Sequence, residues 1–238
     1  MTTFIRIFQT LLFSVWGVET PPQKPRLPGM VKSPRRGLGG ALSKFLRHTA
    51  SRHATAKDTF GKKGWYRVST VLDKLSTIKD LDGLLEVPYL KWCVWADKKN
   101  RFSLGHNDDG ELMICANQGH SFETQDLFTR LRSFEEFRLA LGLCPTDTVQ
   151  GVHGSYVEFR SNILDGGLLS MARTHVHVGV YVNGKTPGSG MRPDCTCAFQ
   201  VQLEDPAFWT EHVVTLSVNR VLLIESRVKP AFIQEFKL

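Results

Sequence analysis

The spacing of apolar residues along this 238-residue chain changes once, near residues 116–124. Before this point apolar residues recur every three or four positions, which is typical of amphipathic helices packed on a core. After it, short strand-like runs predominate, at residues 176–182, 196–203, 212–216 and 220–225. Residues 123–141 are helix-like and form the exception. We therefore predict an α+β protein with two lobes, at residues 41–120 and 121–238.

The first lobe is predicted to consist of helices followed by a hairpin. Residues 41–52 form an amphipathic helix whose polar face carries three basic side chains, Lys44, Arg47 and His48. A short strand at residues 64–68 precedes a helix capped by Ser69, and a further helical segment is interrupted by Pro88. Two strand-like segments then flank the sequence NDDG, in which Asp-Gly favours a tight turn. Helices followed by a hairpin are the order of a winged-helix module.

Residues 1–40 differ in composition from the rest of the chain. Five of the seven net positive charges lie here, so bulk charge alone does not mark the remaining chain as a nucleic-acid-binding protein. Residues 1–18 are apolar but too short to span a bilayer. A secretory segment, a mitochondrial presequence and an extension without a targeting role remain open. Residues 19–40, rich in Pro, Gly and basic residues, are expected to form a flexible linker. The cellular compartment is left undetermined.

Arg173, His175 and His177 occupy every second position of one predicted strand, so they would share a face. A metal, a packed core and an anion could each explain the set. Arginine repels a divalent cation, and no acidic or cysteine partner lies nearby. A packed core does not explain Arg173, because arginine is rarely buried unpaired. An anion explains the set best, since arginine offers a fork of donors to phosphate. No metal is expected.

Four further polar motifs stand out, although each alone is also compatible with an ordinary surface turn. They are Asp97–Phe102, which contains Lys99 and Arg101; Asn117–Ser121; His153-Gly154-Ser155; and Ser189–Pro193, which presents Arg192. Glycine in such motifs permits a close backbone approach to a ligand. The five cysteines are odd in number and lack framework spacing, which favours a reducing compartment.

Taken together and in order, the motifs resemble those of the RNA 2′-phosphotransferases, the NAD-dependent enzymes of tRNA splicing. The resemblance covers residues 41–227 and rests on LSKFLRH, GWYRVSTVL, DKKNRFSL, ANQGHS, VHGSY, ILDGGLLSMARTHVHV, SGMRP and LSVNRVLLIE. It implies an N-terminal winged-helix RNA-binding lobe and a C-terminal, mostly β lobe of the ADP-ribosyltransferase type that binds NAD. It also implies removal of a splice-junction 2′-phosphate in two steps. The phosphate attacks C1″ of NAD and expels nicotinamide, and the 2″-hydroxyl then attacks phosphorus.

The resemblance assigns roles to individual residues. The catalytic set is Arg47, His48, Arg101 and Arg173. Contacts to phosphate or RNA fall to Lys44, Lys99 and Arg192. Contacts to NAD fall to Asn117, Gln118, Gly119, His120, Ser121, His153, Gly154, Ser155 and His175. Three departures from the usual pattern occur: Cys115 stands where arginine is common, which removes a donor; Ser155 replaces threonine, which keeps the hydroxyl; and HVHVG replaces a HIHF-like run.

Two rival functions remain open at this stage. An ADP-ribosyltransferase acting on protein or nucleic-acid ends would leave a stable ADP-ribosyl product. A non-catalytic RNA-binding module would bind RNA without consuming NAD. The expected partners are 2′-phosphorylated tRNA or another RNA and NAD, consumed as a co-substrate, and the chain is expected to act as a monomer with no membrane span.

Overall fold

The computed structural model describes residues 37–53, 64–81, 83–124 and 127–237, and the chain divides into two compact units, Met1–Asn117 and Gln118–Leu238. The segment at residues 1–18 for which targeting roles were considered lies outside the described residues. So does most of the linker predicted at residues 19–40; its last residues, from Leu38, already belong to a helix. The predicted α+β class is confirmed. Within the described residues, no helix is both long enough and apolar enough to cross a membrane.

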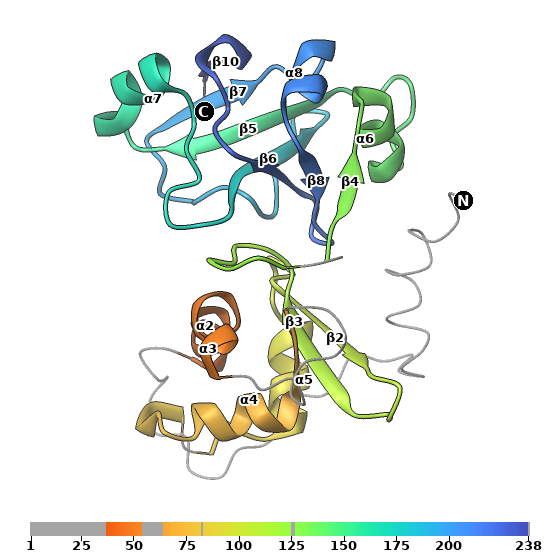
Figure 1. Ribbon diagram of the computed structural model, residues 1–238, viewed down its shortest axis with the longest axis vertical. Coiled ribbons are helices and arrows are strands. Elements are labelled where there is room, and N and C mark those ends of the chain that lie inside the picture. The colour runs from red at the N-terminus through yellow and green to blue at the C-terminus, as the bar shows by residue number, and fades with distance from the viewer. Residues whose placement is uncertain (1–36, 54–63, 82, 125–126, 238) are drawn as a thin grey trace. The chain divides into compact units, whose positions relative to one another are not determined.

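The first unit combines helices with a three-stranded antiparallel sheet (Figure 1). Its elements are α2 (Leu38–Lys44), the π-helical segment η1 (Phe45–Thr49), α3 (Ala50–His53), β1 (Trp65–Arg67), α4 (Val68–Leu75), the 3₁₀ turn η2 (Lys79–Leu81), α5 (Val87–Trp95), β2 (Phe102–His106) and β3 (Leu112–Ala116). The strand order is β1-β3-β2. Fully buried Leu42, Val71, Leu90 and Ile114 bring the helices and the sheet into one core.

Local signals in this unit were partly misjudged. The turn between β2 and β3 forms at NDDG as predicted, with Gly110 at φ +78°. The helix expected to be capped by Ser69 begins one residue earlier, at Val68, and its preceding residue makes no side-chain cap. Pro88 does not interrupt a helix but lies in the first turn of α5, where proline's missing N–H costs nothing.

The second unit is built on a seven-stranded sheet in the order β10-β7-β5-β6-β9-β8-β4, in which all neighbouring strands are antiparallel. Its strands are β4 (Thr129–Leu131), β5 (Val149–Ser155), β6 (His175–Val182), β7 (Cys197–Val201), β8 (Val214–Leu216), β9 (Val221–Glu225) and β10 (Ile233–Phe236). Its helices are α6 (Phe134–Leu141), η3 (Val157–Phe159), α7 (Arg160–Gly166), α8 (Pro206–Glu211) and η4 (Pro230–Phe232). Figure 1 shows α7 at one side of this unit and α6 at the other.

The helix expected over residues 123–141 is only half correct. The structure has strand β4 at Thr129–Leu131 and begins α6 at Phe134. Ser133 starts the helix because its hydroxyl accepts a hydrogen bond from the Glu136 backbone N–H at 3.1 Å. The Glu136 carboxylate in turn accepts from the Arg132 backbone N–H at 2.8 Å. The pair resembles a capping box, except that the carboxylate bonds to the N–H of the residue before the cap.

Gly167 connects α7 to the segment that carries Arg173. It has φ +84°, and a Cβ there would lie 2.1 Å from the Val228 carbonyl oxygen. The close approach lets Leu168 and Val228 exchange two backbone hydrogen bonds, of 2.9 and 3.0 Å. Only glycine fits both the conformation and the space.

Candidate active site

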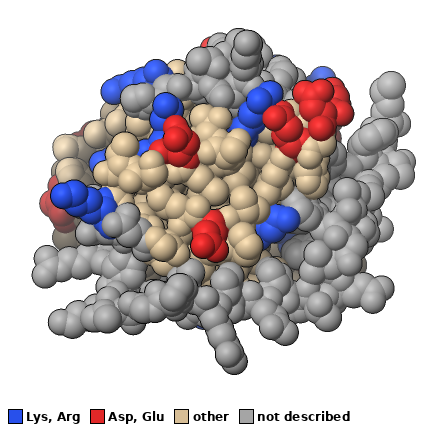
Figure 2. All heavy atoms as spheres, turned by 90° about the horizontal axis from the view of Figure 1, so that it is seen from below, with Lys and Arg blue, Asp and Glu red and all other residues tan. Residues whose placement is uncertain are grey.

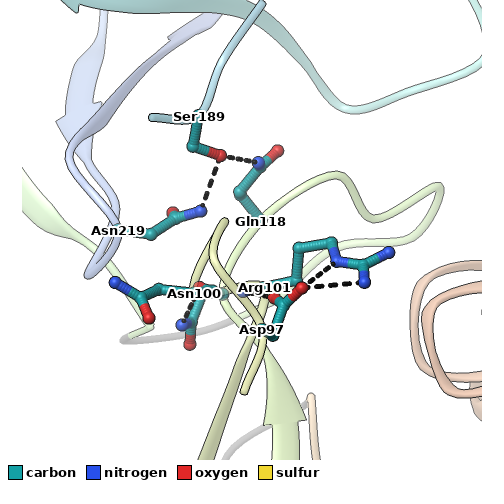
Figure 3. A network of polar contacts seen from close by, with 7 residues as sticks. Asp97, Asn100, Arg101, Gln118, Ser189 and Asn219 are labelled. Atoms are coloured by element: carbon teal, nitrogen blue, oxygen red, sulfur yellow. Dashed lines mark hydrogen bonds and ion pairs between the residues drawn. The ribbon is translucent and has the colours of Figure 1, made fainter. Parts of the chain in front are cut away.

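In the first unit, Arg101 lies in a tightly held turn that leads into β2 (Figure 3). The Asp97 carboxylate accepts hydrogen bonds from the backbone N–H of Arg101 at 2.6 Å and from its Nε and Nη2 at 2.9 and 2.8 Å. Asn100 has φ +45°, a conformation that asparagine tolerates. Lys99, on the same turn, is exposed. The turn therefore presents two cations from a fixed backbone.

Asn117, expected to contact NAD, bonds within the first unit instead. Its Nδ2 donates to the Asn100 carbonyl at 2.7 Å, and its Oδ1 accepts from the Ser103 hydroxyl at 2.7 Å. Its backbone N–H donates to the Arg101 carbonyl at 2.8 Å. These bonds brace the turn that carries Lys99 and Arg101. A cofactor contact by Asn117 stays a prediction.

Cys115 is buried in β3, paired with Trp65 of β1 and Ser103 of β2. Burial raises the pKa of its thiol, so the side chain is neutral. Its Sγ lies 4.0 Å from the Asn117 Oδ1. The residue that replaces the usual arginine thus packs in the sheet beside the asparagine that braces the turn.

Arg47 and His48 lie in the π-helical segment between α2 and α3. There the Ala50 N–H bonds to the Phe45 carbonyl, five residues back, which makes a wider turn than an α-helix allows. Such insertions occur frequently at functional sites. Arg47 is half-buried, with Nε and Nη2 shielded from solvent, while His48 is exposed, as is Lys44 at the end of α2. The sequence predicted that the three basic residues share one solvated face. The structure differs, because Arg47 is half-buried.

In the second unit, His153, His177 and Arg173 are linked through strands β5 and β6. His153 Nδ1 lies 2.8 Å from the His177 carbonyl oxygen. Because a carbonyl only accepts, Nδ1 of His153 carries the proton. Arg173 precedes β6 and is not on it, yet its Nη1 lies 3.4 Å from Nδ1 of His177. His177, which the sequence analysis left out of the assigned site, therefore orients both neighbours.

The surroundings of His153 keep its ring neutral, so that the ring can accept a hydrogen bond. Burial lowers its pKa, and the positive charges of Arg173 and Arg192 lower it further, against the hydrogen bond to His177. The neutral ring with a proton on Nδ1 leaves Nε2 as a hydrogen-bond acceptor. A hydroxyl group is the natural partner for that nitrogen.

Arg192 extends the cationic group. The pKa of Arg173 is lowered by burial and then by repulsion from Arg192. The pKa of Arg192 itself is raised, because its Nη1 donates to the Tyr156 hydroxyl at 3.0 Å and that bond outweighs the opposing effect of burial. Tyr156 in turn donates to the Asp194 carboxylate at 2.9 Å. Two guanidinium groups that repel each other form a region of positive potential, which favours an anion.

Close backbone packing brings the Arg192 loop onto the sheet. A Cβ on Gly154 would lie 2.9 Å from Cys195 Sγ and 3.0 Å from Met191 Cε. Gly190, at φ +92°, lies so close to Gly179 of β6 that a Cβ there would meet the Gly179 Cα at 2.7 Å. Ser155 follows on β5 and pairs with Cys197. Gly179 and Gly190 have packing roles that the sequence did not reveal.

The segment after Asn117 belongs to the second unit and is anchored there. Gln118 is buried and its Nε2 donates to the Ser189 hydroxyl at 3.4 Å, which also accepts from Asn219 Nδ2 at 3.0 Å (Figure 3). Gly119 adopts φ +87°, and Ser121 is exposed. The predicted cofactor motif is thereby attached to the loop that contains Arg192.

His120 connects this segment to the residues before β6. Its carbonyl accepts from the backbone N–H of Thr174 at 3.2 Å and from the Thr174 hydroxyl at 3.3 Å. Since that hydroxyl donates to His120, it accepts from Nδ1 of His175 at 2.7 Å. The rings of His120 and His175 both contact Phe128. The His175 side chain therefore packs on Phe128 and holds the Thr174 hydroxyl. Burial lowers its pKa.

On the face in Figure 2, acidic and basic side chains are interspersed around an uncharged area. Among the described residues, no group of three or more His, Cys, Asp or Glu side chains could hold a metal ion.

The two groups of fixed cations, on a frame of helices and antiparallel sheets, define an α+β protein equipped to bind phosphate-bearing ligands. A model of the RNA 2′-phosphotransferase, Tpt1/KptA family, matches residues 33–226, and the chain belongs to this family. The membership predicted from eight ordered motifs, and with it an RNA 2′-phosphotransferase enzyme, is confirmed.

Curated relatives agree with the family. The chain is 33% identical over 188 residues to tRNA 2′-phosphotransferase 1 of Danio rerio, covering 76% of each chain. It is 27% identical over 193 residues to tRNA 2′-phosphotransferase of Saccharomyces cerevisiae, covering 79% of this chain and 78% of the relative. It is 31% identical over 169 residues to tRNA 2′-phosphotransferase 1 of Homo sapiens, covering 68% of this chain and 58% of the relative.

Proposed function

We propose that the protein transfers the splice-junction 2′-phosphate of a tRNA to ADP-ribose supplied by NAD. In the first step a phosphate oxygen bonds to C1″ of the nicotinamide ribose, and the bond from C1″ to nicotinamide breaks. In the second step the 2″-hydroxyl attacks phosphorus and the bond to the RNA 2′-oxygen breaks, with a proton moving from one oxygen to the other. The products are RNA with a free 2′-hydroxyl, nicotinamide and ADP-ribose 1″,2″-cyclic phosphate.

The second unit is proposed as the NAD-binding, ADP-ribosyltransferase-like lobe. The observation that carries this proposal is His153, whose tautomer and lowered pKa leave Nε2 as an acceptor beside two cations. His153 accepts from a ribose hydroxyl, and the backbone of Gly154 approaches the nicotinamide amide. Arg173 and Arg192 neutralise phosphate charge. The residues present therefore fit NAD.

The first unit is proposed as a winged-helix RNA-binding lobe. Its order of helix, strand, two helices and hairpin, with a three-stranded sheet, supports this assignment. Arg101 and Lys99 bind the 2′-phosphate from the braced turn, and Arg47 adds a third cation. His48, which is exposed, assists the proton transfer of the second step. No step needs a metal.

The test uses a short RNA with one internal 2′-phosphate, incubated with the protein with and without NAD. The proposal expects NAD-dependent loss of the phosphate and formation of a cyclic phosphate of ADP-ribose. A stable ADP-ribosylated RNA or protein would instead support an ADP-ribosyltransferase. RNA binding without NAD consumption would support a non-catalytic module.

A further inference from the structure

Asp97 stands out in the first unit as a nearly buried carboxylate in a region proposed to bind an anion. Its side chain is 7% exposed, against 30% for that of Arg101. A negative charge beside a phosphate site opposes phosphate binding by simple Coulomb repulsion. A carboxylate at this position therefore needs a role whose benefit outweighs this repulsion.

The geometry shows what the carboxylate does to Arg101. Oδ1 of Asp97 accepts from both Nε and Nη2, while Oδ2 accepts from the Arg101 backbone N–H. Side chain and backbone of Arg101 are thus held by one group. Figure 3 shows the outer nitrogens of the guanidinium lying beyond the carboxylate. Of its five N–H donors, the two on Nη1 and the second on Nη2 stay on this outer edge, which is the edge that can bind two oxygens of one phosphate.

Two further contacts limit the movement of this group. The Asn100 N–H donates to the Asp97 backbone carbonyl at 2.8 Å, so the residues between Asp97 and Arg101 form a closed turn. Gly39 of α2 also lies close to this group, since a Cβ there would be 3.4 Å from Arg101 Nη2. The guanidinium is therefore confined by a carboxylate and by a helix of the same unit.

We infer that Asp97 is a positioning residue for the 2′-phosphotransfer reaction, which orients Arg101 so that its outer edge receives the 2′-phosphate. The inference rests on the role proposed for Arg101. It predicts an effect opposite in sign to that of charge alone. Asp97→Ala makes the turn more positive, yet it frees the guanidinium and lowers activity. A purely electrostatic account predicts unchanged or tighter RNA binding.

The experiment measures kcat/KM for a 2′-phosphorylated RNA at saturating NAD, together with NAD affinity by calorimetry. We expect Asp97→Ala to lose about 10- to 100-fold in kcat/KM, as for a lost charged hydrogen bond, with NAD affinity unchanged. Asp97→Asn recovers part of the loss, because its Oδ1 still accepts from the guanidinium while its Nδ2 faces the backbone N–H. In Asp97→Ala/Arg101→Ala the two losses do not add, because both act through one guanidinium.

Glu111→Ala provides the matched control, since it breaks the 2.9 Å ion pair with Arg67 in the same unit. Its kcat/KM is expected to match that of the unchanged protein. Full activity of Asp97→Ala beside an inactive Arg101→Ala would overturn the inference alone. Full activity of Arg101→Ala would overturn the proposed role of Arg101 itself. Fully additive losses in the double variant would show that Asp97 acts elsewhere.

Discussion

Gly154→Ala tests whether close packing at the end of β5 is required for NAD binding. The added Cβ would lie 2.9 Å from Cys195 Sγ, 3.0 Å from Met191 Cε and 3.1 Å from Cys195 Cβ. Carbon and sulfur atoms ordinarily pack at about 3.5–4.0 Å, so the neighbours must move by roughly 0.5–1 Å. Overpacking of this kind costs about 1–3 kcal/mol.

The expected consequence has two parts. The thermal midpoint falls by about 3–9 °C, taking roughly 3 °C per kcal/mol for a chain of this size. The KM for NAD rises more than the KM for RNA, because the displaced loop contains Arg192. Differential scanning fluorimetry and steady-state kinetics measure the two effects separately.

A neighbouring glycine supplies the control. A Cβ on Gly188 would have no heavy atom within 4 Å, so Gly188→Ala is expected to change neither quantity. Adding Cys195→Ala to Gly154→Ala removes the closest contact and should restore part of the midpoint. A Gly154→Ala protein with unchanged midpoint and unchanged KM for NAD would refute the packing argument.

Three other outcomes are expected. Arg101→Ala and Arg173→Ala each lose on the order of 100-fold in 2′-phosphate removal while circular dichroism stays unchanged; full activity of either protein contradicts the assigned role. NAD affinity is independent of pH above the ordinary histidine pKa of 6.5 and decreases only at more acidic pH, because the lowered pKa of His153 keeps its Nε2 unprotonated until then. Calorimetry measures this dependence. If His153→Asn shows the same loss of NAD affinity at acidic pH, His153 is not the titrating group. Gly167→Ala destabilises the protein by about 3 kcal/mol or more, since a positive φ and a backbone clash combine, whereas Gly166→Ala, with nothing near its Cβ, has little effect on chemical denaturation.

Some structural errors of the sequence analysis concern signals that were present but outweighed by a stronger pattern. Ser133 and Glu136 have the spacing of a capping box, yet the apolar repeat across residues 123–141 suggested one long helix. Pro88 was treated as a helix breaker although proline also suits a first turn. Both outcomes depend on which of two local preferences the surrounding core supports.

Other features had no local signal at all. The π-helical segment at Phe45–Thr49 places Arg47 and His48 differently from an ordinary helix. Asn117 and Gln118 are neighbours in sequence, but their side chains bond in different units. Asp97 looked like one charge in a basic cluster, and its bonds to Arg101 depend on how the turn closes.

The sequence by itself determined the change from helices to strands, the hairpin turn and the family, and it predicts that Arg173 faces an anion. The family follows from the resemblance of eight ordered motifs, and the others follow from residue types at short, regular spacing, which constrain the backbone or the chemistry wherever the segment lies. Only the tertiary structure decided which nitrogen of His153 carries its proton. That choice depends on the His177 carbonyl, which is 24 residues away and reaches His153 only when β5 and β6 pair. Contacts between distant segments form through packing of the whole unit, and no single segment encodes them.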